Sequence, residues 1–453
     1  MQKNDVIELY ITGMTSDGNG VGRYNDFAVF VPLTDIGDEA EVKIIKVLKS
    51  YAIGKLVSLI NSSQNRIDNN CGAFTKCGGC SYRHINYGHE LMIKKNMVKE
   101  SFNRIAKIET DEIEIIGADE ISGYRNKAMY PIRKDNNGVI VSGFFGKNSH
   151  RIVECDDCKL QPPVFNQILA EILSFIREND ISVYDEQSNT GLIRHVYIRY
   201  AQITGEIMVC IVINGRKIPF SDKLIYRLTK RFEGVKSIFI NVNTQKTNVI
   251  LGDKCVLLWG KDSITDRICS IDINISPLSF YQVNRSMAEK LYEIAGDWAG
   301  LCGRETVVDL YCGTGTIGLT MADKAEAVIG VEVVAQAVED ASENAKINGI
   351  KNARFICGDA YEAAVQLEKE GIKADVVIVD PPRKGLEKGL AEFISTKLSP
   401  ERIVYISCDP ATLARDCAVF KEFGYGIKKV KAVDLFPRTS HVECVVLMSR
   451  VEK

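Results

Sequence analysis

In the first 60 residues, short apolar runs alternate with polar positions, and turn residues separate the runs. Alternation with a period of two predicts β-strands that bury one face. The glycine-rich stretch Gly18–Gly22 predicts the turn between the first two strands, and the polar stretch Asn61–Asn65 predicts a linker. Residues 1–60 are therefore expected to form a small β-barrel, with strands that include Val6–Ile11, Phe27–Val31 and Glu41–Ile45.

The middle of the chain, residues 61–270, mixes strand-like runs with helical segments, which is typical of an α+β domain. Helical spacing predicts helices over Pro163–Glu178 and Asp222–Phe232. A third helix is expected over His89–Ile105, and its basic residues are Lys94, Lys95, Lys99 and Arg104.

From residue 271 to residue 453, strand-like and helical segments alternate strictly. This pattern predicts a doubly wound α/β sheet with parallel strands. The last two strands are nearly adjacent in sequence, which favours an antiparallel hairpin at the end of the sheet. The expected strands are Glu305–Leu310, Ala327–Val331, Ala353–Cys357, Ala374–Val379, Arg402–Ser407, Ile427–Asp434 and His441–Met448.

Composition supports a multidomain globular protein without excluding nucleic acid as a partner. The chain has 453 residues, of which 45% are hydrophobic and 26% charged, and more than one core is expected at this length. No stretch reaches the roughly 18 apolar residues of a membrane span. With no apolar signal region after Met1, we expect a cytoplasmic protein. A net charge of −2 means that any RNA affinity must come from local patches.

A glycine-rich turn after the first strand of the last domain predicts a cofactor site. Gly313–Gly318 matches G-x-G-x-x-G, and Glu332 at the end of the next strand could hold both hydroxyls of a ribose. Both a dinucleotide and S-adenosylmethionine satisfy these requirements. Asp309 favours S-adenosylmethionine, because it could bind the ammonium of a methionine moiety but would repel a pyrophosphate. Asp359 could accept a hydrogen bond from the adenine amino group, and Asp380 begins an Asp-Pro-Pro-Arg turn after the fourth strand.

Cys408 is the candidate nucleophile, since it stands where an apolar strand ends and a helix begins. Ligands bind at this edge of doubly wound sheets, and a helix N-terminus is expected to lower the pKa of a thiol. Glu443 is the candidate general base, because a carboxylate in a cleft has a raised pKa. His441 is the alternative base. Gln282, just before the last domain, could serve the cofactor or the base.

Cysteines also cluster far from this site. The chain has 14 cysteines, and Cys71, Cys77 and Cys80 are separated by five and two residues. Four thiolates suit zinc or a [4Fe–4S] cluster. The tight Cys-Gly-Gly-Cys spacing favours iron–sulfur. Cys158 is the best candidate for a fourth ligand, and Cys155 is the alternative.

Together these residues resemble the RNA (uracil-5-)-methyltransferase family, in the iron–sulfur branch that carries an N-terminal TRAM domain. The resemblance covers the whole chain and includes several signatures of the central domain: Tyr124–Lys127, Tyr184–Glu186, Leu192–Val196, Asn241–Asn243 and Asn248–Gly252. It implies an OB-like TRAM barrel in residues 1–60 and a Rossmann-like class I methyltransferase domain in residues 271–453. The implied S-adenosylmethionine-binding residues are Gln282, Tyr311, Glu332 and Asp380, in addition to Asp309, Gly313 and Asp359 from the motif itself.

The resemblance further implies a covalent mechanism. The Cys408 thiolate would add to C6 of a uracil, C5 would take the methyl group, and Glu443 would remove the C5 proton. The implied cluster ligands are Cys71, Cys77, Cys80 and Cys158. A TRAM domain together with a cluster is more similar to the 23S ribosomal RNA enzymes than to the transfer RNA ones, and we expect a monomer. The barrel and the basic helix at residues 93–107 would hold the RNA strand.

Three alternatives stay open at this point. The substrate could be transfer RNA, or the methylated base could be cytosine, since the same covalent logic serves both pyrimidines. The third alternative is a protein without catalytic activity, which would use an iron–sulfur cluster for RNA binding or assembly. Such a protein would not need Cys408, and the chain has both the cluster cysteines and Cys408.

Overall fold

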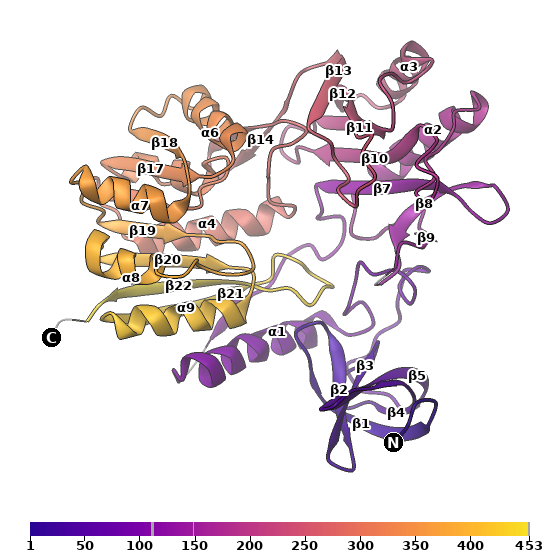
Figure 1. The fold of residues 1–453 in the computed structure, drawn as a ribbon, viewed down its shortest axis with the longest axis horizontal. Coiled ribbons are helices and arrows are strands. Elements are labelled where there is room, and N and C mark those ends of the chain that lie inside the picture. Colours follow the sequence, from indigo (N-terminus) through magenta and orange to yellow (C-terminus); the bar gives the residue numbers. More distant parts are fainter. Residues whose placement is uncertain (110–112, 148, 452–453) are drawn as a thin grey trace.

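Five strands at the amino terminus close into a barrel in the computed structural model of the chain (Figure 1). The structure describes residues 1–109, 113–147 and 149–451, so that a few positions inside the predicted ranges 61–270 and 271–453 lie outside it. The strand order β1-β2-β3-β5-β4 confirms the predicted barrel. Its strands are β1 (Val6–Met14), β2 (Asn19–Tyr24), β3 (Phe27–Pro32), β4 (Glu39–Val47) and β5 (Tyr51–Asn61).

The barrel's loops differ from the prediction at the glycine-rich stretch, and the predicted linker is anchored to the barrel. Most of the glycine-rich stretch lies in β2, where a Cβ on Gly22 would stand 2.5 Å from the Tyr10 carbonyl oxygen, so glycine lets two strands approach closely. The polar stretch after β5 is not a free linker. Its Ser63 is buried, and the hydroxyl donates to Asp35 Oδ2 over 2.7 Å, because the acidic residues of the barrel need buried donors.

The helix predicted over His89–Ile105 is present as α1 (Tyr87–Ser101), continued by a π-helical turn η1 (Phe102–Ala106). It packs against the carboxy-terminal domain, and Val98 and Phe102 belong to that domain's core. One of its basic residues cannot bind RNA, contrary to the prediction, because the Lys94 side chain is 0% exposed. Arg104, by contrast, is exposed.

The central sheet has the strand order β13-β12-β11-β10-β7-β8-β9 within the described residues. Its apolar face packs against two helices, α2 (Pro163–Glu178) and α3 (Ser221–Arg231), whose positions confirm the predicted helices. The strands are β7 (Lys127–Lys134), β8 (Ile140–Phe145), β9 (Ile152–Glu154), β10 (Ile193–Tyr200), β11 (Ile207–Ile213), β12 (Val235–Val242) and β13 (Lys254–Gly260).

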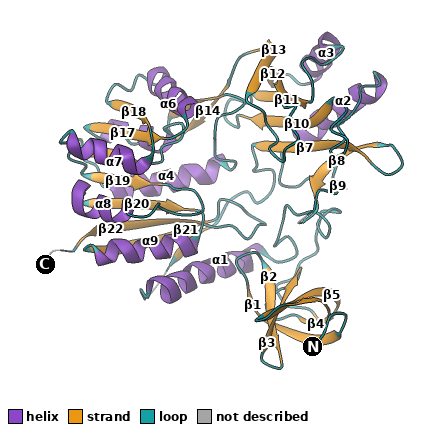
Figure 2. Ribbon diagram, viewed as in Figure 1, coloured by secondary structure: helices purple, strands orange, loops and turns teal. Residues whose placement is uncertain are grey.

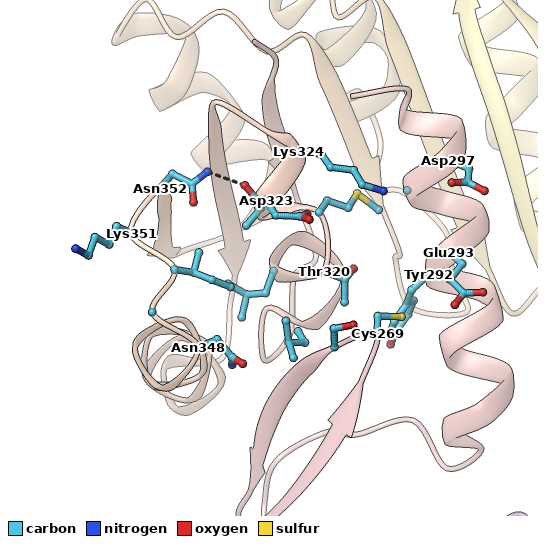
Figure 3. Close-up of a pocket in the computed structure, with 18 residues that line it drawn as sticks. Cys269, Tyr292, Glu293, Asp297, Thr320, Asp323, Lys324, Asn348, Lys351 and Asn352 are labelled. Carbon is cyan, nitrogen blue, oxygen red and sulfur yellow. Dashed lines mark hydrogen bonds between the residues drawn. The ribbon is translucent and has the colours of Figure 1, made fainter. Parts of the chain in front are cut away.

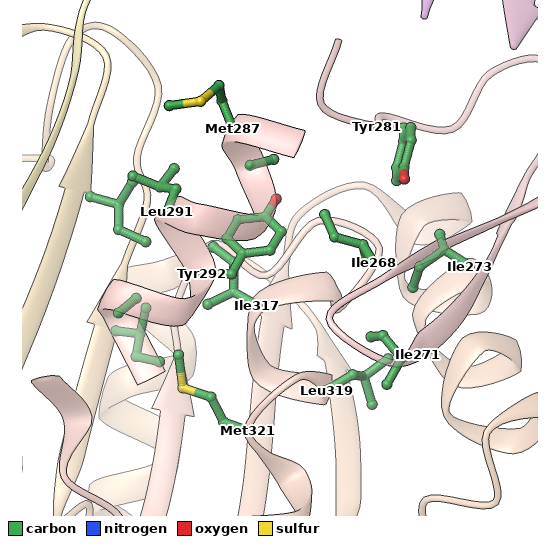
Figure 4. Close-up of a cluster of buried hydrophobic side chains, with 14 of the residues drawn as sticks. Ile268, Ile271, Ile273, Tyr281, Met287, Leu291, Tyr292, Ile317, Leu319 and Met321 are labelled. Atoms are coloured by element: carbon green, nitrogen blue, oxygen red, sulfur yellow. The ribbon is translucent and has the colours of Figure 1, made fainter. Parts of the chain in front are cut away.

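A hairpin joins the central sheet to the last domain. Its strands β14 (Ile264–Ile268) and β15 (Ile271–Ile275) pair only with each other in the described structure. Figure 4 shows its isoleucines packed with Leu291 and Tyr292 of α4 (Arg285–Ala299) and with Leu319. This apolar cluster fixes the segment that carries Gln282 against the last domain.

The carboxy-terminal sheet has the order β18-β17-β16-β19-β20-β22-β21-β6 in the described residues. Neighbouring strands are parallel except that β22 is antiparallel to both β20 and β21, as the predicted hairpin requires. The strands are β16 (Thr306–Asp309), β17 (Ala327–Glu332), β18 (Ala353–Cys357), β19 (Val376–Val379), β20 (Arg402–Ser407), β21 (Tyr425–Val433) and β22 (Glu443–Arg450).

Helices cover both faces of this sheet (Figure 2). Alternate residues of one strand face opposite cores: Val307 packs with the α4 side and Val308 with the α7–α9 side. The helical segments are α5 (Thr316–Leu319), η2 (Ala322–Lys324), α6 (Ala335–Ile347), α7 (Ala360–Lys369), α8 (Leu390–Phe393), η3 (Ile394–Leu398) and α9 (Pro410–Glu422).

The sheet also contains a strand that the sequence pattern did not predict. β6 (Glu114–Ile116) lies far upstream in the chain and pairs in parallel with β21 at the sheet edge. The division at residues 60 and 270 stays a prediction, since α1 and β6 pack with the last domain. In the part of the chain described here, no helix is both long and apolar enough to cross a membrane.

Candidate active site

The carboxyl ends of the parallel strands surround a cavity of about 1300 Å³. It lies where the strand order reverses between β16 and β19, which is the usual ligand position in such sheets. The cavity brings together residues that are more than 150 positions apart in sequence. All but one of the predicted cofactor and catalytic residues line it: Gln282, Tyr311, Gly313, Glu332, Asp359, Asp380, Cys408 and Glu443.

The carboxylate of Glu332, at the end of β17, binds the glycine loop that follows β16. Glu332 Oε2 accepts a hydrogen bond from the Gly313 backbone N–H over 3.2 Å, and Oε1 accepts one from Val334 N–H over 2.9 Å. Gly315 has a positive φ of 78°, and a Cβ there would stand 2.9 Å from the Phe355 ring. Glycine at this position therefore satisfies both the backbone conformation and the packing against β18.

Asp309 is the predicted cofactor residue that does not line the cavity. Its side chain is fully buried, and among the described residues Oδ2 has no hydrogen-bond partner. The pKa of Asp309 is raised to about 7, mainly by burial, with contributions from the nearby carboxylates of Asp380 and Glu332. Oδ1 accepts from the Tyr311 backbone N–H over 3.4 Å, so the carboxyl has one free oxygen among the described residues, which suits a cationic ligand. Its predicted contact with an ammonium group stays a prediction.

Two further carboxylates have different surroundings. Burial raises the pKa of Asp380 to about 7. Asp359 instead caps the amino terminus of α7, where Oδ1 accepts from the backbone N–H groups of Tyr361 (2.9 Å) and Glu362 (3.2 Å). Asp359 therefore has a clear structural role beside the one predicted for it.

Cys408 is half-buried at the end of β20, directly before α9. Its pKa is raised to about 11 by burial and then by the negative charges of Glu443 and Asp380, whereas Arg383 lowers it. The expected lowering by the helix N-terminus is therefore wrong. The first N–H groups of α9 are capped by Asp409, which accepts from Ala411 and Thr412, and burial outweighs what remains.

Glu443 is the first residue of β22 and is 5% exposed. Its pKa is raised to about 8 by burial and then by Asp380, whereas Arg383 lowers it. The direction agrees with the expectation for a carboxylate in a cleft. At neutral pH this carboxyl holds its proton in the absence of a cation, and an added positive charge would favour its ionisation.

Beside His441, which the sequence suggested as an alternative base, the cavity wall contains residues that were not predicted as site residues, among them Arg125, Arg383 and Phe436. Arg383 Nη2 lies 3.1 Å from His441 Nε2, and the His441 ring meets Phe436 edge-on at 6.0 Å between centroids. Burial and then Arg383 lower the pKa of His441. Arg125 also lines the cavity, from the central domain. Arg125 lies in the noted stretch Tyr124–Lys127 and Arg383 in the turn that begins with Asp380, so proximity to these motifs was the available signal. Phe436 lies between two predicted strands and had no such signal.

The cysteine cluster lies in the central region. Cys71, Cys77, Cys80 and Cys158 are half-buried free thiols. They are close enough to influence one another: the pKa of Cys77 is raised by burial and then by Cys158 and Cys71, and that of Cys80 is raised to about 11 by burial, with Cys158 contributing. The Cys155 thiol contacts Cys158 and lowers the pKa of Cys158 to about 6. Within the described ranges, no group of three or more such side chains stands at metal-binding geometry.

Comparison with known proteins agrees with this geometry. The tRNA (uracil-5-)-methyltransferase family model matches residues 86–451, and the TRAM domain model matches residues 2–57. An uncharacterized RNA methyltransferase of Clostridium tetani is 45% identical over 449 residues, which are 99% of this chain and 97% of the relative. Another from Clostridium acetobutylicum is 44% identical over 456 residues, covering 100% of this chain and 99% of the relative.

A solved structure is similar over the full length. The crystal structure of Pyrococcus abyssi tRNA (uracil-54, C5)-methyltransferase in complex with S-adenosyl-L-homocysteine aligns with a TM-score of 0.79 and 28% identity. The alignment covers 98% of this chain and 100% of that chain.

Proposed function

The chain belongs to the RNA uracil-5-methyltransferase family, whose members use S-adenosylmethionine, and from this premise we propose that it methylates C5 of a uridine in 23S ribosomal RNA through a covalent adduct with Cys408. One observation carries the mechanism. A thiol, a buried carboxyl and a glycine loop, contributed by separate strands, meet at one cavity. Family membership decides against the non-enzymatic alternative and against cytosine as the base.

The two catalytic residues answer a problem of reactivity. C5 of uracil is a poor nucleophile, and adding the Cys408 thiolate at C6 places negative charge on C5 and O4. The methyl carbon then bonds to C5 as its bond to the sulfonium breaks. Glu443 takes the proton from C5, and the electrons of that C–H bond form the C5–C6 double bond while the C6–Sγ bond breaks. Cys408 leaves as a thiolate.

The cofactor site is also suited to its ligand. S-adenosylmethionine supplies an electrophilic methyl group and carries a sulfonium and an ammonium. The pKa of Asp309 and of Asp380 is raised to about 7, so both carboxyls are partly protonated at neutral pH without the cofactor, and its positive charges would favour their ionisation. We propose that Gln282, Tyr311, Gly313, Glu332, Asp359 and Asp380 line the bound cofactor and that the buried Asp309 compensates its ammonium charge.

The regions outside the catalytic site support an RNA target. The TRAM barrel and the cysteine cluster lie outside the methyltransferase domain, and their combination is similar to that of the 23S ribosomal RNA enzymes. The similar archaeal structure is a transfer RNA enzyme, so transfer RNA is the second candidate. The proposed partner is RNA alone, and the proposed state is a cytoplasmic monomer.

Two measurements test the proposal. The purified enzyme should form a stable adduct with RNA that carries 5-fluorouridine at the target, because fluorine cannot leave as a proton does. Mapping 5-methyluridine in RNA from a strain lacking the gene should then show its loss from 23S ribosomal RNA. Loss from transfer RNA only would move the proposal to the second candidate, and a wild-type enzyme that forms no adduct would contradict the covalent mechanism.

We also propose that Cys71, Cys77, Cys80 and Cys158 hold a [4Fe–4S] cluster. Support comes from the donor set: four free thiols from two segments influence one another, and Cys158 interacts with both Cys77 and Cys80. Cys155 also contacts Cys158, so it stays the alternative fourth ligand. Four thiolates match the ligand requirement of such a cluster, which would join the 71–80 loop to the segment before α2.

The cluster proposal has its own test. Protein purified without oxygen should be brown and contain about four irons per chain. Cys158→Ser should bleach it, whereas Cys155→Ser should not. A colourless protein with one zinc would contradict the cluster, and an intact cluster in Cys158→Ser would move the fourth ligand to Cys155.

A further inference from the structure

The loop between β21 and β22 carries part of the catalytic site. Phe436 and His441 line the cavity, and Glu443 follows directly at the start of β22. Loops are usually exposed, but most of this one is buried: Asp434 is 0%, Arg438 6% and Ser440 7% exposed. Something other than its own sheet must therefore determine its conformation.

A neutral quartet of buried charges connects the loop to α1. Lys94 Nζ donates to Glu90 Oε1 and to Asp434 Oδ1, both over 2.7 Å, and to the Phe436 carbonyl oxygen over 3.2 Å. Arg438 completes the quartet, since its backbone N–H donates to Glu90 Oε1 over 2.7 Å and its guanidinium lies 3.5 Å from Glu90 Oε2. Lys94, Glu90 and Asp434 are 0% exposed.

Tyr87, also on α1, extends this connection. Its hydroxyl donates to Asp434 Oδ2 over 2.8 Å and accepts from the Ala118 backbone N–H over 2.7 Å. The backbone of Asp434 donates to the Ile116 carbonyl oxygen of β6 over 2.9 Å. Asp434 is therefore held by the two segments that the amino-terminal half contributes to this sheet.

The tip of the loop is held by the residues that follow Cys80 and by the central domain. Arg438 has a positive φ of 71°, and its carbonyl oxygen accepts from the backbone N–H groups of Ser81 (2.8 Å) and Tyr82 (3.1 Å). The Tyr124 hydroxyl donates to the Pro437 carbonyl oxygen over 2.9 Å. An unfavourable backbone conformation persists where surrounding contacts over-determine it.

We propose that the quartet of Glu90, Lys94, Asp434 and Arg438 is a positioning device for the release step, which holds the 434–442 loop so that Glu443 reaches the C5 proton. The inference rests on the proposed role of Glu443. It assigns Lys94 to the catalytic loop rather than to RNA. Buried ion pairs contribute little net stability but can specify one conformation, which is the property that a positioning device needs.

The experiment separates adduct formation from release in a single turnover. In Lys94→Met, binding of S-adenosylmethionine and adduct formation with 5-fluorouridine RNA should stay within about threefold of wild type. Release of methylated RNA should slow by about 10-fold to 100-fold, as expected for a small misplacement of a catalytic group. Lys290→Met is the control with the same substitution, because Lys290 of α4 forms an ion pair with the exposed Asp119 (2.8 Å), away from the quartet, and should leave release unchanged.

Tyr87→Phe is the second variant, since it removes one hydroxyl and keeps the charges. Tyr87→Phe should also slow release, by less than Lys94→Met does. If Lys94→Met does not fold, Tyr87→Phe tests the inference in its place. Wild-type release in either folded variant, or a loss of RNA affinity with normal release, would overturn the inference. If wild type itself forms no adduct, the proposed function fails and the inference fails with it. A normal wild-type adduct with unchanged release in the variants contradicts the inference alone.

Discussion

The two edges of the carboxy-terminal sheet each carry a cavity. Charged groups are exposed in one cavity and buried in the other. The pocket at the amino ends of β17 and β18, here called the amino-edge pocket, measures about 780 Å³ (Figure 3). Its charged residues Glu293, Asp323 and Lys351 are exposed to solvent. The cavity at the carboxyl edge measures about 1300 Å³, and Glu443 in its wall is buried.

The difference shows that a concave surface is not sufficient for chemistry. Exposed charges keep their hydration, whereas buried ones change their protonation and respond to a ligand's charge. The pKa of Glu443 is raised to about 8 and that of Asp309 to about 7, both mainly by burial. The amino-edge pocket has a cysteine too, and the pKa of Cys269 is raised to about 12 by burial and then by Glu289 and Glu293, whereas Arg285 lowers it.

The largest difference between the two cavities is expected when the cysteine of each, Cys408 or Cys269, is replaced. Cys408→Ala should abolish turnover and the 5-fluorouridine adduct, because no other thiol lines the carboxyl-edge cavity among the described residues. S-adenosylmethionine binding, measured by calorimetry, should remain near wild type. Cys269→Ala, at the amino-edge pocket, should retain full turnover. Near-normal turnover in Cys408→Ala would break the comparison.

The next largest effect concerns the two glutamates. Glu443→Gln should slow release of methylated RNA by about 10²–10⁴-fold, since a general base is lost, and the covalent RNA adduct should accumulate on denaturing gels. A base must be unprotonated, so wild-type release should rise with pH up to about 8 and then level off. The variant should lose this rise. Glu293→Gln is the control at the other edge, and a normal release rate in Glu443→Gln would assign the base to His441 or water.

A smaller effect is expected for the aspartates. Asp309→Asn should weaken S-adenosylmethionine binding by about 10-fold to 100-fold, the typical loss for one charged hydrogen-bond partner. Asp323→Asn at the amino-edge pocket should leave the affinity unchanged, because that carboxylate is exposed. Equal S-adenosylmethionine affinities in the two variants would contradict the proposed role of Asp309 in cofactor binding.

The smallest effect is on stability without cofactor. The pKa of Glu443 is higher in the folded chain than in the unfolded chain, so unfolding releases a proton between the two values. Wild type should therefore lose stability as pH rises from about 4.5 to about 8, and Glu443→Gln should show less of this loss. Urea unfolding at pH 5 and pH 9 measures this. A variant that is no more stable than wild type at pH 9 would mean that Glu443 is well solvated.

Much of the fold could be predicted from local pattern. The strand Arg402–Ser407 and the helix Pro163–Glu178 have the predicted bounds, because alternation and helical spacing are properties of consecutive residues. β6 could not be predicted in the same way. A strand of three residues carries too little periodicity, and its pairing with β21 depends on a partner more than 300 residues away.

For the candidate site, too, local pattern predicted some properties and not others. Motif spacing placed Gly313, Glu332, Asp380 and Cys408 at strand ends, and parallel strands bring those ends to one edge. Spacing could not show how deeply each group is buried. For this reason the direction of the Cys408 pKa shift was predicted wrongly, since burial and two carboxylates outweigh the helix N-terminus.

The sequence by itself determined the barrel, the doubly wound sheet and the residues that meet at its carboxyl edge. These follow from the period of apolar positions and from residue order along each strand. Only the tertiary structure decided that Lys94 pairs with Asp434, and that Asp309 is fully buried and does not line the cavity. The physical reason is that burial and charge pairing depend on groups brought together from distant parts of the chain, and these contacts have no local pattern in the sequence.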